Sequence, residues 1–511
     1  MSCGRLQRLY NECVAEKAQT KEHSSNETIS TSGGAAKELY TQTVFPGRLL
    51  MLGCGAIAQS IIPMLLRHTD ITPERMKIIT ADKMGKSVAD HFGIEFIIEP
   101  LTPENYTKIL KKHLSKDDFL LNLSVDVSYH DLILLCQKFG VLYLDTSAEF
   151  WPGFSVDPSL PLHQRTNYAY DDDFRTLQKK HRGGPTAVVN HGANPGLVSH
   201  FVKQALLDIA RDIGNGAAAR GIPTDRLGWA QLMQSLGVRV VQFSERDTQN
   251  SRAFKQAGEF VNTWSIDGFL SELVQPAEFG WGTHERELPA DGHLHESGSK
   301  GIIYLERPGG LTLVRTWTPR EGSFQGFLMT HEETMTTANY YTVSEGDRVV
   351  FRPTAMYAYH PCDDAVLSVR EYGANNWKQP RKRRILMKDI ESGSDELGVL
   401  LLGHKKRGYW FGSDLSIAQV RELAPEQNAT CMQVAAGALA GTIWALENPQ
   451  QGVVEPEDLD FQRILHIAMP YLGTVHGKYT TWTPLRDRKA PLFPQNIAAD
   501  DPWQFKNFLV I

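Results

Sequence analysis

The sequence lacks the features that mark membrane proteins and disulfide-rich proteins. Its six cysteines form no CxxC pair and have no regular spacing, which excludes a disulfide framework and is typical of a reduced, cytoplasmic protein. No apolar run approaches the length of a membrane span, and the best candidate, 434–445, is interrupted. We therefore expect a cytoplasmic protein without a membrane segment.

Strong net charge and the common hydrolase motifs are absent as well. A formal net charge of -6 over 511 residues gives no electrostatic reason to expect nucleic acid or an anionic membrane as a partner. The basic segment 378–388 has no interleaved aromatic residues, so we expect a solvated loop or strand there. There is no P-loop and no G-x-S-x-G elbow. His293 and His295 lack an accompanying Cys or acid set at ligand spacing, so no metal site is expected.

The chain is long enough for more than one packed unit. Residues 1–44 are rich in Ser, Thr, Glu and Lys, which predicts a mobile leader. Between 45 and 195, short apolar strands alternate with helical patterns, which predicts an α/β fold with a Rossmann-type doubly wound parallel sheet. Residues 196–415 contain alternating runs that predict a second, mixed α/β domain with an antiparallel sheet for substrate or dimer contacts. Residues 416–511 are expected to form a C-terminal helical segment that returns to the first domain.

A glycine-rich turn follows the first predicted strand. Gly53, Gly55 and Ala58 fit G-x-G-x-x-A directly after "RLLML" and at the start of a helical pattern. Gly53 permits the tight turn, and Gly55 lets the backbone approach a pyrophosphate. The free N–H groups of the helix then face the phosphates. This context predicts a dinucleotide site, whereas the same motif alone would fit a nucleotide-free α/β domain.

An acid ends the second predicted strand, "MKIITAD". At this position the carboxylate of Asp82 can accept hydrogen bonds from both adenosine ribose hydroxyls. A carboxylate repels a 2'-phosphate, so Asp82 favours NAD over NADP, a preference that Lys83 and Lys86 weaken. The predicted cofactor-binding residues are Gly53, Gly55, Ala56, Ile57, Asp82 and Asn194.

Further polar residues follow later strands of the predicted sheet. Asp126 comes just after a buried strand, and Asn194 lies in a Pro-Gly turn. Both residue types commonly form turns and cap helices. Because open parallel sheets bind ligands at their carboxyl edges, the same side chains are also candidates to bind a cofactor or an amine.

At this point the sequence resembles the bacterial-type homospermidine synthase family, which is related to the saccharopine dehydrogenase-like enzymes. The resemblance runs from about Pro46 to near the C-terminus. Its segments are "MLGCGAIAQ", "NLSVDVSYHDL", "LDTSAEFWPG", "NHGANPGLVSHFVKQAL", "VQFSERDTQ", "FVNTWSIDGFLSE" and "LMTHEE". The resemblance implies a homodimer in which a Rossmann domain and a mixed α/β domain enclose the substrate. It also implies that two putrescine molecules form sym-homospermidine with release of ammonia, with NAD as a recycled redox cofactor.

The resemblance also implies site residues. The family's tryptophan that stabilises a cationic intermediate falls on Trp264, and its two amine-site acids fall on Glu245 and Glu272. The remaining positions are Asn194, His331 and Asp126. Putrescine and related diamines are the expected substrates. Which acid anchors an ammonium group and which one moves a proton stays open.

The segment "FVNTWSIDGFLSEL" has two interpretations, a core anchor with solvated acids or a cation site. If the helix begins at about Trp264, the positions 264, 268 and 272 share one stripe, and Gly268 leaves a gap between the indole and Glu272. A diamine-sized cation fits such a gap. Asp267 is expected to be a first-turn helix acid outside the site.

Two other functions compete with this prediction. An NAD(P)-dependent amine or amino-acid dehydrogenase of the saccharopine or carboxyspermidine type would need Arg or Lys to hold a substrate carboxylate. A non-catalytic NAD-binding protein would use the same fold without needing the acids.

Overall fold

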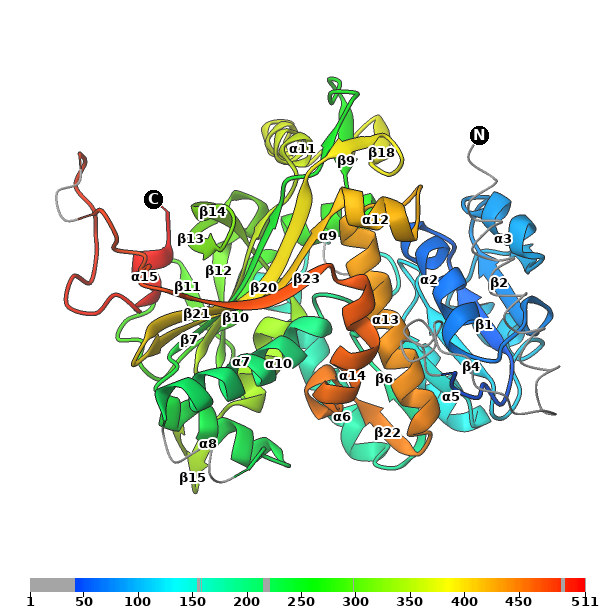
Figure 1. Ribbon diagram of the computed structural model, residues 1–511, viewed down its shortest axis with the longest axis horizontal. Coiled ribbons are helices and arrows are strands. Elements are labelled where there is room, and N and C mark those ends of the chain that lie inside the picture. Colours follow the sequence, from blue (N-terminus) through cyan, green and yellow to red (C-terminus); the bar gives the residue numbers. More distant parts are fainter. Residues whose placement is uncertain are drawn as a thin grey trace, which may run out of the picture.

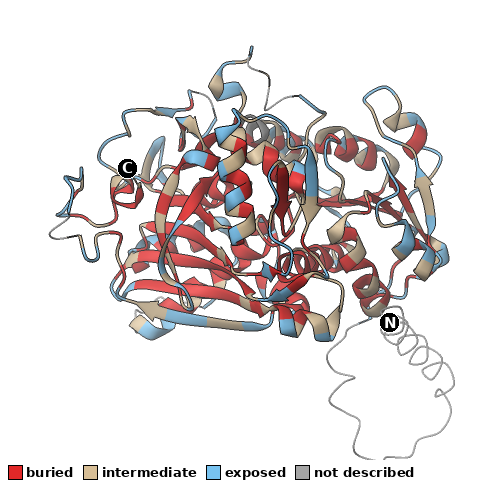
Figure 2. Ribbon diagram, turned by 90° about the horizontal axis from the view of Figure 1, so that it is seen from above, coloured by how far each residue is buried: buried red, intermediate tan, exposed pale blue. Residues whose placement is uncertain are grey.

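The computed structural model describes residues 42–510, apart from 154–156, 158, 215–220, 297 and 489–491. Of the predicted leader, only 42–44 fall within this part of the chain. Two large sheets organise the described residues, and helices from both halves of the chain lie between them (Figure 1). In Figure 2 the strands of both sheets are mostly buried, and one large hydrophobic cluster contains residues from both sheets.

The first sheet is parallel throughout. Its seven strands follow the order β22-β6-β5-β4-β1-β2-β3, and every pair runs parallel. Apart from β22, this is the strand order of a doubly wound dinucleotide-binding sheet, with its switch point between β1 and β4. The Rossmann prediction is confirmed. The strands are β1 (Leu49–Leu52), β2 (Met76–Thr80), β3 (Glu95–Ile98), β4 (Phe119–Asn122), β5 (Leu142–Asp145), β6 (Gly184–Val188) and β22 (Gln451–Val454).

Helices cover both faces of this sheet. The strands β1, β4 and β5 are buried at every position, as expected for continuous apolar runs with helices on either side. The helices of this part are α2 (Ala56–His68), α3 (Lys86–Phe92), α4 (Tyr106–Leu110), α5 (Tyr129–Phe139) and α6 (Tyr168–Lys180), with the short 3-10 turns η1 (Pro73–Arg75) and η2 (Leu162–Gln164).

The second sheet has ten strands and is mixed. Its main path is β11-β12-β10-β17-β7-β20-β21-β23, and β13 and β14 branch from β17. The central pair β7 and β17 runs parallel, which the alternating pattern did not predict. The strands are β7 (Val240–Asp247), β10 (Pro276–Gly280), β11 (Gly292–Leu294), β12 (Ile302–Pro308), β13 (Leu313–Thr318), β14 (Gly322–Met329), β17 (Thr354–His360), β20 (Ser394–His404), β21 (Arg407–Ser416) and β23 (Thr474–Thr480).

Three short strand pairs and a set of helices complete the second half. The pairs are β8 (Asn250–Ser251) with β19 (Ile390–Ser392), β9 (Glu259–Asn262) with β18 (Lys382–Ile385), and β15 (Val343–Glu345) with β16 (Arg348–Phe351). The helices are α7 (Leu197–Ile213), α8 (Arg226–Leu236), α9 (Ile266–Val274), α10 (Glu332–Tyr340), α11 (Asp363–Ala374), α12 (Ile417–Leu423), α13 (Ala429–Glu447), α14 (Phe461–Ala468) and α15 (Phe505–Phe508), with the 3-10 turns η4 (Gly309–Leu311), η5 (Pro456–Asp458) and η6 (Met469–Tyr471).

Helix α13 lies between the two sheets and packs against α2 (Figure 1). By length and composition alone it could cross a membrane, but 94% of its apolar window is buried inside the protein. Small residues allow this burial, since a Cβ added at Gly437 would lie 1.9 Å from the carbonyl oxygen of Gly192. The helix is therefore a core helix that joins the two halves.

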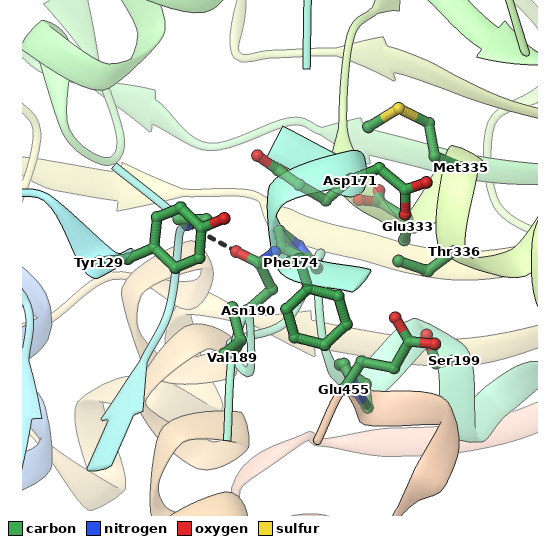
Figure 3. A pocket seen from close by; sticks show the side chains of 14 residues that line it. Tyr129, Asp171, Phe174, Val189, Asn190, Ser199, Glu333, Met335, Thr336 and Glu455 are labelled. Atoms are coloured by element: carbon green, nitrogen blue, oxygen red, sulfur yellow. Dashed lines mark hydrogen bonds between the residues drawn. The ribbon is translucent and has the colours of Figure 1, made fainter. Parts of the chain in front are cut away.

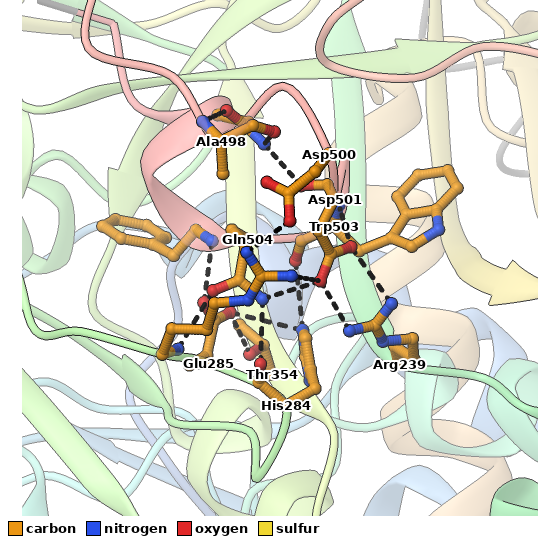
Figure 4. Close-up of polar contacts among 12 residues, drawn as sticks. Arg239, His284, Glu285, Thr354, Ala498, Asp500, Asp501, Trp503 and Gln504 are labelled. Carbon is orange, nitrogen blue, oxygen red and sulfur yellow. Dashed lines mark hydrogen bonds and ion pairs between the residues drawn. The ribbon is translucent and has the colours of Figure 1, made fainter.

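The C-terminal segment is more than helical, which corrects the expectation for 416–511. Strand β22 joins the first sheet, and β23 joins the second. The end of the chain is held on the outside of the second sheet by polar contacts (Figure 4). Arg239 pairs with Asp501 at 2.7 Å, and the ring of His284 lies 3.0 Å from the carbonyl oxygen of Trp503.

Candidate active site

The glycine turn lies at the carboxyl end of β1. Gly53 has a φ of +80°, and a Cβ there would lie 2.7 Å from the carbonyl oxygen of Leu123, so only glycine fits. A Cβ at Gly55 would meet nothing within 4 Å, which means that the space beside it is open. No side chain caps α2, whose first residues are Ala56 and Ile57. Its N–H groups are therefore free to bind an anion such as a pyrophosphate.

Asp82 lies just beyond β2, beside this turn. Its side chain is exposed and accepts a hydrogen bond of 2.7 Å from the backbone N–H of Met84. Asp82 is also close enough to Cys54 to matter electrostatically: burial and then this carboxylate raise the pKa of the Cys54 thiol to about 11. The acid thus faces the turn from the neighbouring strand end, where a ribose would lie in a dinucleotide site.

Three polar residues meet at the carboxyl ends of β4, β5 and β6. Asp126 follows β4 with a φ of +62°, so its role as a turn-former is real. Its backbone N–H donates to the carboxylate of Glu149, which follows β5. The Asp126 side chain is exposed, and the surrounding protein and then the charge of Asp267 raise the pKa of its carboxyl group. Asn194 follows β6 and reaches the second sheet.

Glu245, on β7, receives that contact. The Asn194 amide donates to Oε2 of Glu245 at 2.8 Å, and the Tyr357 hydroxyl donates to the same oxygen at 2.6 Å. The residue is only 3% exposed. Burial raises its pKa to about 7, against the opposing effect of both hydrogen bonds. No described side chain hydrogen-bonds to Oε1 of Glu245, so that oxygen is available to a ligand.

Strand alternation explains which side chains share this face. Glu245 and Asp247 are two residues apart on β7, and Tyr357 and Tyr359 are two residues apart on the adjacent strand β17. The two tyrosine rings stack with centroids 5.5 Å apart. The Tyr359 hydroxyl accepts a hydrogen bond of 3.0 Å from the indole N–H of Trp264. Tyr359 on β17 therefore fixes the orientation of the indole.

The helix after Trp264 begins later than expected. It starts at Ile266, with Ser265 as a cap whose hydroxyl accepts from the N–H of Gly268. Trp264 therefore precedes the helix rather than opening it. The indole still lies over Gly268, because a Cβ there would be 3.3 Å from Cζ3 of the ring. The gap predicted at Gly268 is filled by the indole itself, and the partly exposed ring lines the cleft.

Glu272 lies one turn further along α9 and pairs with His331. The ring of His331 is 3.4 Å from Glu272 and, through Nδ1, 3.1 Å from Glu333. Burial would lower the pKa of His331, but Glu333 and Glu272 together raise it well above its ordinary value. The side chain of Glu272 is 20% exposed and so remains accessible from the cleft. A protonated imidazole between two carboxylates can pass a proton to either side.

The structure also brings in acids that the sequence prediction missed. Glu149 and Glu332 keep some accessible surface, yet protein surrounds both carboxyl groups. The pKa of Glu149 is raised to about 8 and that of Glu332 to about 7, chiefly by burial, and the charge of Glu272 contributes to both. Position after β5 and the "HEE" sequence were the signals that could have identified them.

His331, Glu332 and Glu333 also bring potential metal ligands within 4.8 Å of one another. A protonated His331 has no lone pair to offer a metal ion. In this structure the His331 ring instead pairs with the carboxylates of Glu272 and Glu333, at 3.4 and 3.1 Å.

Asp267 and the basic segment 378–388, which the sequence analysis placed outside the site, both form ion pairs. Asp267 lies in the first turn of α9, as predicted, and pairs with Arg383 at 3.0 Å. Lys382 and Arg384 pair with Glu259 at 3.1 and 3.0 Å. The basic segment forms β18, which pairs with the strand just before Trp264. Its role in these contacts is to hold that strand.

His293 and His295, which are two residues apart in the sequence, also have separate partners. The Nε2 atom of His293 lies 2.9 Å from Glu306, and that of His295 lies 2.8 Å from Glu278. The two imidazoles thus face different acids rather than a common centre.

Comparison with known proteins identifies the family to which this chain belongs. Residues 49–188 match the family model of the saccharopine dehydrogenase NADP binding domain, and residues 192–480 match that of the saccharopine dehydrogenase C-terminal domain. The homospermidine synthase of Mesorhizobium japonicum is 46% identical over 471 residues, which cover 91% of this chain and 96% of the relative. That of Blastochloris viridis is 45% identical over 468 residues, with 91% and 97% covered.

A solved structure agrees over nearly the same length. The crystal structure of homospermidine synthase from Legionella pneumophila in complex with NAD has a TM-score of 0.86 and 43% identity, and the match covers 92% of this chain and 99% of that one. The two matched family models together span both sheets and the segments that carry Glu245, Trp264, Glu272 and His331. The chain belongs to the homospermidine synthase family, within the saccharopine dehydrogenase-like proteins.

Proposed function

We propose that this protein is an NAD-dependent homospermidine synthase. It joins two putrescine molecules into sym-homospermidine and releases ammonia, as an aminobutyl transferase of polyamine biosynthesis. The observation that carries the proposal is that contacts through Tyr357 and Tyr359 join Glu245, the partly exposed Trp264 and the His331–Glu272 pair. Such a site matches a diamine with two ammonium groups.

The chain supplies a suitable cofactor site. The open space at Gly55, the free N–H groups of α2 and the carboxylate of Asp82 fit the pyrophosphate and ribose of NAD. When bound, NAD supplies the hydride acceptor for the first half of the reaction and the hydride donor for the second. Asn194 lies between this edge of the first sheet and Glu245, where it can orient both cofactor and amine.

The acids divide the work between anchoring and proton transfer. We assign the anchor to Glu245, because both described donors bind its Oε2 and leave Oε1 for an ammonium group, and because the residue is only 3% exposed. Glu272, paired with the protonated His331, then takes the proton from the reacting nitrogen, since an amine loses hydride only when its nitrogen carries a lone pair. Trp264 faces the planar iminium carbon that results and stabilises its charge.

The rest of the cycle is an exchange of amines. The neutral nitrogen of a second putrescine attacks the iminium carbon, a C–N bond forms, and the original nitrogen leaves as ammonia. Hydride then returns to the new imine, and the net redox change is zero. The exposed Asp126 attracts the second amine, and Glu149 and Glu332, whose pKa values burial raises to about 8 and about 7, ionise more readily when an ammonium group is nearby.

The competing dehydrogenase would have to bind a substrate carboxylate. The side chains assigned here to the amine site are Glu245, Trp264, Glu272, Asn194, His331 and Asp126, and none of them is Arg or Lys. An acid-lined cleft repels a carboxylate, so a diamine is the better match.

We also propose a homodimer that works in the cytoplasm. The support is the family resemblance for the dimer and, for the compartment, the free and buried state of Cys54, Cys136, Cys362 and Cys431. Neither a nucleic acid nor a membrane is among the proposed partners, given the modest net charge of -6.

The direct test is product analysis. Purified protein incubated with putrescine and NAD should form homospermidine and an equal amount of ammonia, measured by mass spectrometry and an ammonia assay. NADH absorbance should stay constant after the first turnover. Steady growth of NADH without a polyamine product would instead support the dehydrogenase alternative.

The loss of kcat/KM at low pH should follow the protonation of Glu245. Burial raises its pKa to about 7, and only the ionised form attracts an ammonium group. Below that pH, kcat/KM for putrescine should fall by about tenfold per pH unit. Tyr357→Phe removes a hydrogen bond that stabilises the charged form, so the limb should move to higher pH. A limb near the ordinary glutamate pKa of about 4.3 in both proteins would contradict this assignment.

A further inference from the structure

The side chain of Asn428 connects the Trp264 segment to the start of α13. Asn428 is fully buried and is the N-cap of α13, where its Oδ1 accepts a hydrogen bond of 2.7 Å from the N–H of Cys431. Its amide nitrogen donates to the carbonyl oxygen of Thr263 at 2.6 Å and to that of Leu386 at 2.7 Å. Among the common N-cap residues, only asparagine carries both an acceptor for the helix and two N–H donors.

The two carbonyl groups follow paired strands. Thr263 comes directly after β9, and Leu386 comes directly after β18, which runs parallel to β9. One amide group therefore closes the end of this strand pair, just where the chain turns toward Trp264. The Thr263 side chain is held as well, since its hydroxyl donates to Oδ2 of Asp247 at 2.8 Å. The residue before the indole is thus fixed through both its backbone and its side chain.

Gln427, the residue before Asn428, contacts the other domain. Its Oε1 lies 2.7 Å from the hydroxyl oxygen of Ser60 on α2. Ser60 is near the start of that helix, whose N–H groups face the proposed pyrophosphate site. Two consecutive residues thus hold the cofactor helix on one side and the Trp264 segment on the other. We call this pair, Gln427 and Asn428, the bridging corner.

Accurate placement of the indole matters because space for water lies close to the reaction centre. A cavity of about 460 Å³ has Glu333 and Met335 among its lining residues (Figure 3), and Glu333 pairs with His331 through Oε2. Water that reaches the iminium carbon converts it to an aldehyde, so the indole must cover this carbon. A displacement of the ring by about 1 Å is enough to change the outcome of the reaction.

We propose that Asn428 is a positioning residue for Trp264, and that Gln427 sets this position relative to α2 and the NAD bound there. The bridging corner acts through Thr263 on one side and Ser60 on the other. It thereby fixes the indole, which belongs to the second domain, against the cofactor, which belongs to the first. This inference rests on the proposed function, in which the indole retains the iminium.

Asn428→Ser tests the contact with the Trp264 segment. Serine can still cap α13, but one hydroxyl cannot donate to two carbonyl oxygens. Water should then reach the iminium carbon and release ammonia, and the hydride should stay on the cofactor. The ratio of 4-aminobutanal to homospermidine, with NADH equal to the aldehyde, should rise by about fivefold or more, measured by mass spectrometry and absorbance. Unfolded protein lowers both products alike, so this ratio reports placement rather than stability.

Three further variants make the test decisive. Gln427→Ala changes a partly exposed side chain, which has little effect on folding, and should raise the same ratio about twofold. In the Trp264→Ala background, Asn428→Ser should change the ratio by less than about twofold, because both changes act through one side chain. Asp225→Ser exchanges the N-cap of α8, whose carboxylate accepts from the N–H of Gly228, and is the matched control that should change nothing.

The product ratio can also overturn the proposal. It is wrong if Asn428→Ser or Gln427→Ala is folded and leaves the ratio unchanged. It is equally wrong if Asn428→Ser raises the ratio by the same factor with and without the Trp264 indole. Gln427→Ala decides the matter where Asn428→Ser does not fold.

A separate measurement does not depend on the product. Hydrogen exchange of the backbone amides in 259–266 should become about tenfold faster in Asn428→Ser, because the clamp on the strand ends is lost, and should stay unchanged in Asp225→Ser. If the parent protein forms no homospermidine, the proposed function fails, and the exchange rates still show whether Asn428 holds the Trp264 segment. Equal exchange in the parent protein and Asn428→Ser would refute that contact.

Discussion

Glu245→Gln should lower kcat/KM for putrescine by about 10²- to 10³-fold. The loss of one partner from a buried, hydrogen-bonded charge pair costs about 2–5 kcal/mol. In this protein the carboxylate is 3% exposed and offers Oε1 as the anchor for an ammonium group. Glutamine keeps one oxygen for the Asn194 and Tyr357 donors, but it then presents an amide N–H₂ to the substrate. Two donors would face each other where an ion pair had been.

The measurement is steady-state kinetics together with NAD binding. The dissociation constant of NAD should stay within about threefold of the parent value. The predicted NAD contacts Gly53 and Asp82 follow β1 and β2 of the first sheet, whereas Glu245 lies on β7 of the second sheet. Glu278→Gln is a suitable control, since Glu278 is also fully buried and pairs with His295 outside the cleft. A similar loss of kcat/KM in both variants would show that a buried glutamate supports the fold rather than the substrate.

The local features of the sequence were sufficient for the first sheet. The apolar strand before Gly53, the glycine turn and the acid at Asp82 each depend on a few neighbouring residues, and the structure has all three at the edge of β1 and β2. The strand-end rule also identified Asp126 and Asn194, because every strand of a parallel sheet ends at the same edge.

The second sheet shows the limit of such patterns. Parallel and antiparallel neighbours have the same two-residue alternation, so nothing local shows that β7 and β17 run parallel. That pairing places Tyr359 opposite Glu245 and brings the Tyr357 hydroxyl within hydrogen-bond distance of the Glu245 carboxylate. The contact between Asn194 and Glu245 likewise joins two domains, and no periodicity in either segment could predict it.

The raised pKa values were beyond prediction for a related reason. Glu245 titrates near 7 because it is buried, and His331 is held protonated by two acids from different elements. Burial and charge proximity are properties of the packed molecule. The resemblance supplied the names of the site residues, and the geometry supplied their division into an anchor and a proton-transfer pair.

Trp264→Ala should reduce turnover by about 30-fold or more and should also change the products. Cation–π stabilisation in a site shielded from water is worth about 2 kcal/mol. The indole is held for this task by Tyr359 at 3.0 Å and by close contact with Gly268. Its removal opens space beside the iminium carbon, and water can then hydrolyse the intermediate to an aldehyde and ammonia. The hydride is not returned in that case, so NADH should accumulate together with 4-aminobutanal.

Trp264→Phe separates the two effects of the indole, because a phenyl ring fills part of the space but attracts a cation less strongly. We expect a smaller loss, about fivefold, with little aldehyde. Trp377→Ala is the matched control: Trp377 is also partly buried and lies 5.2 Å from the ring of Tyr372, outside the cleft. If Trp264→Ala loses turnover but never leaks aldehyde or NADH, the indole stabilises charge without excluding water. If NAD affinity falls in parallel with turnover, Trp264 is a core anchor, and the cation–π role is wrong.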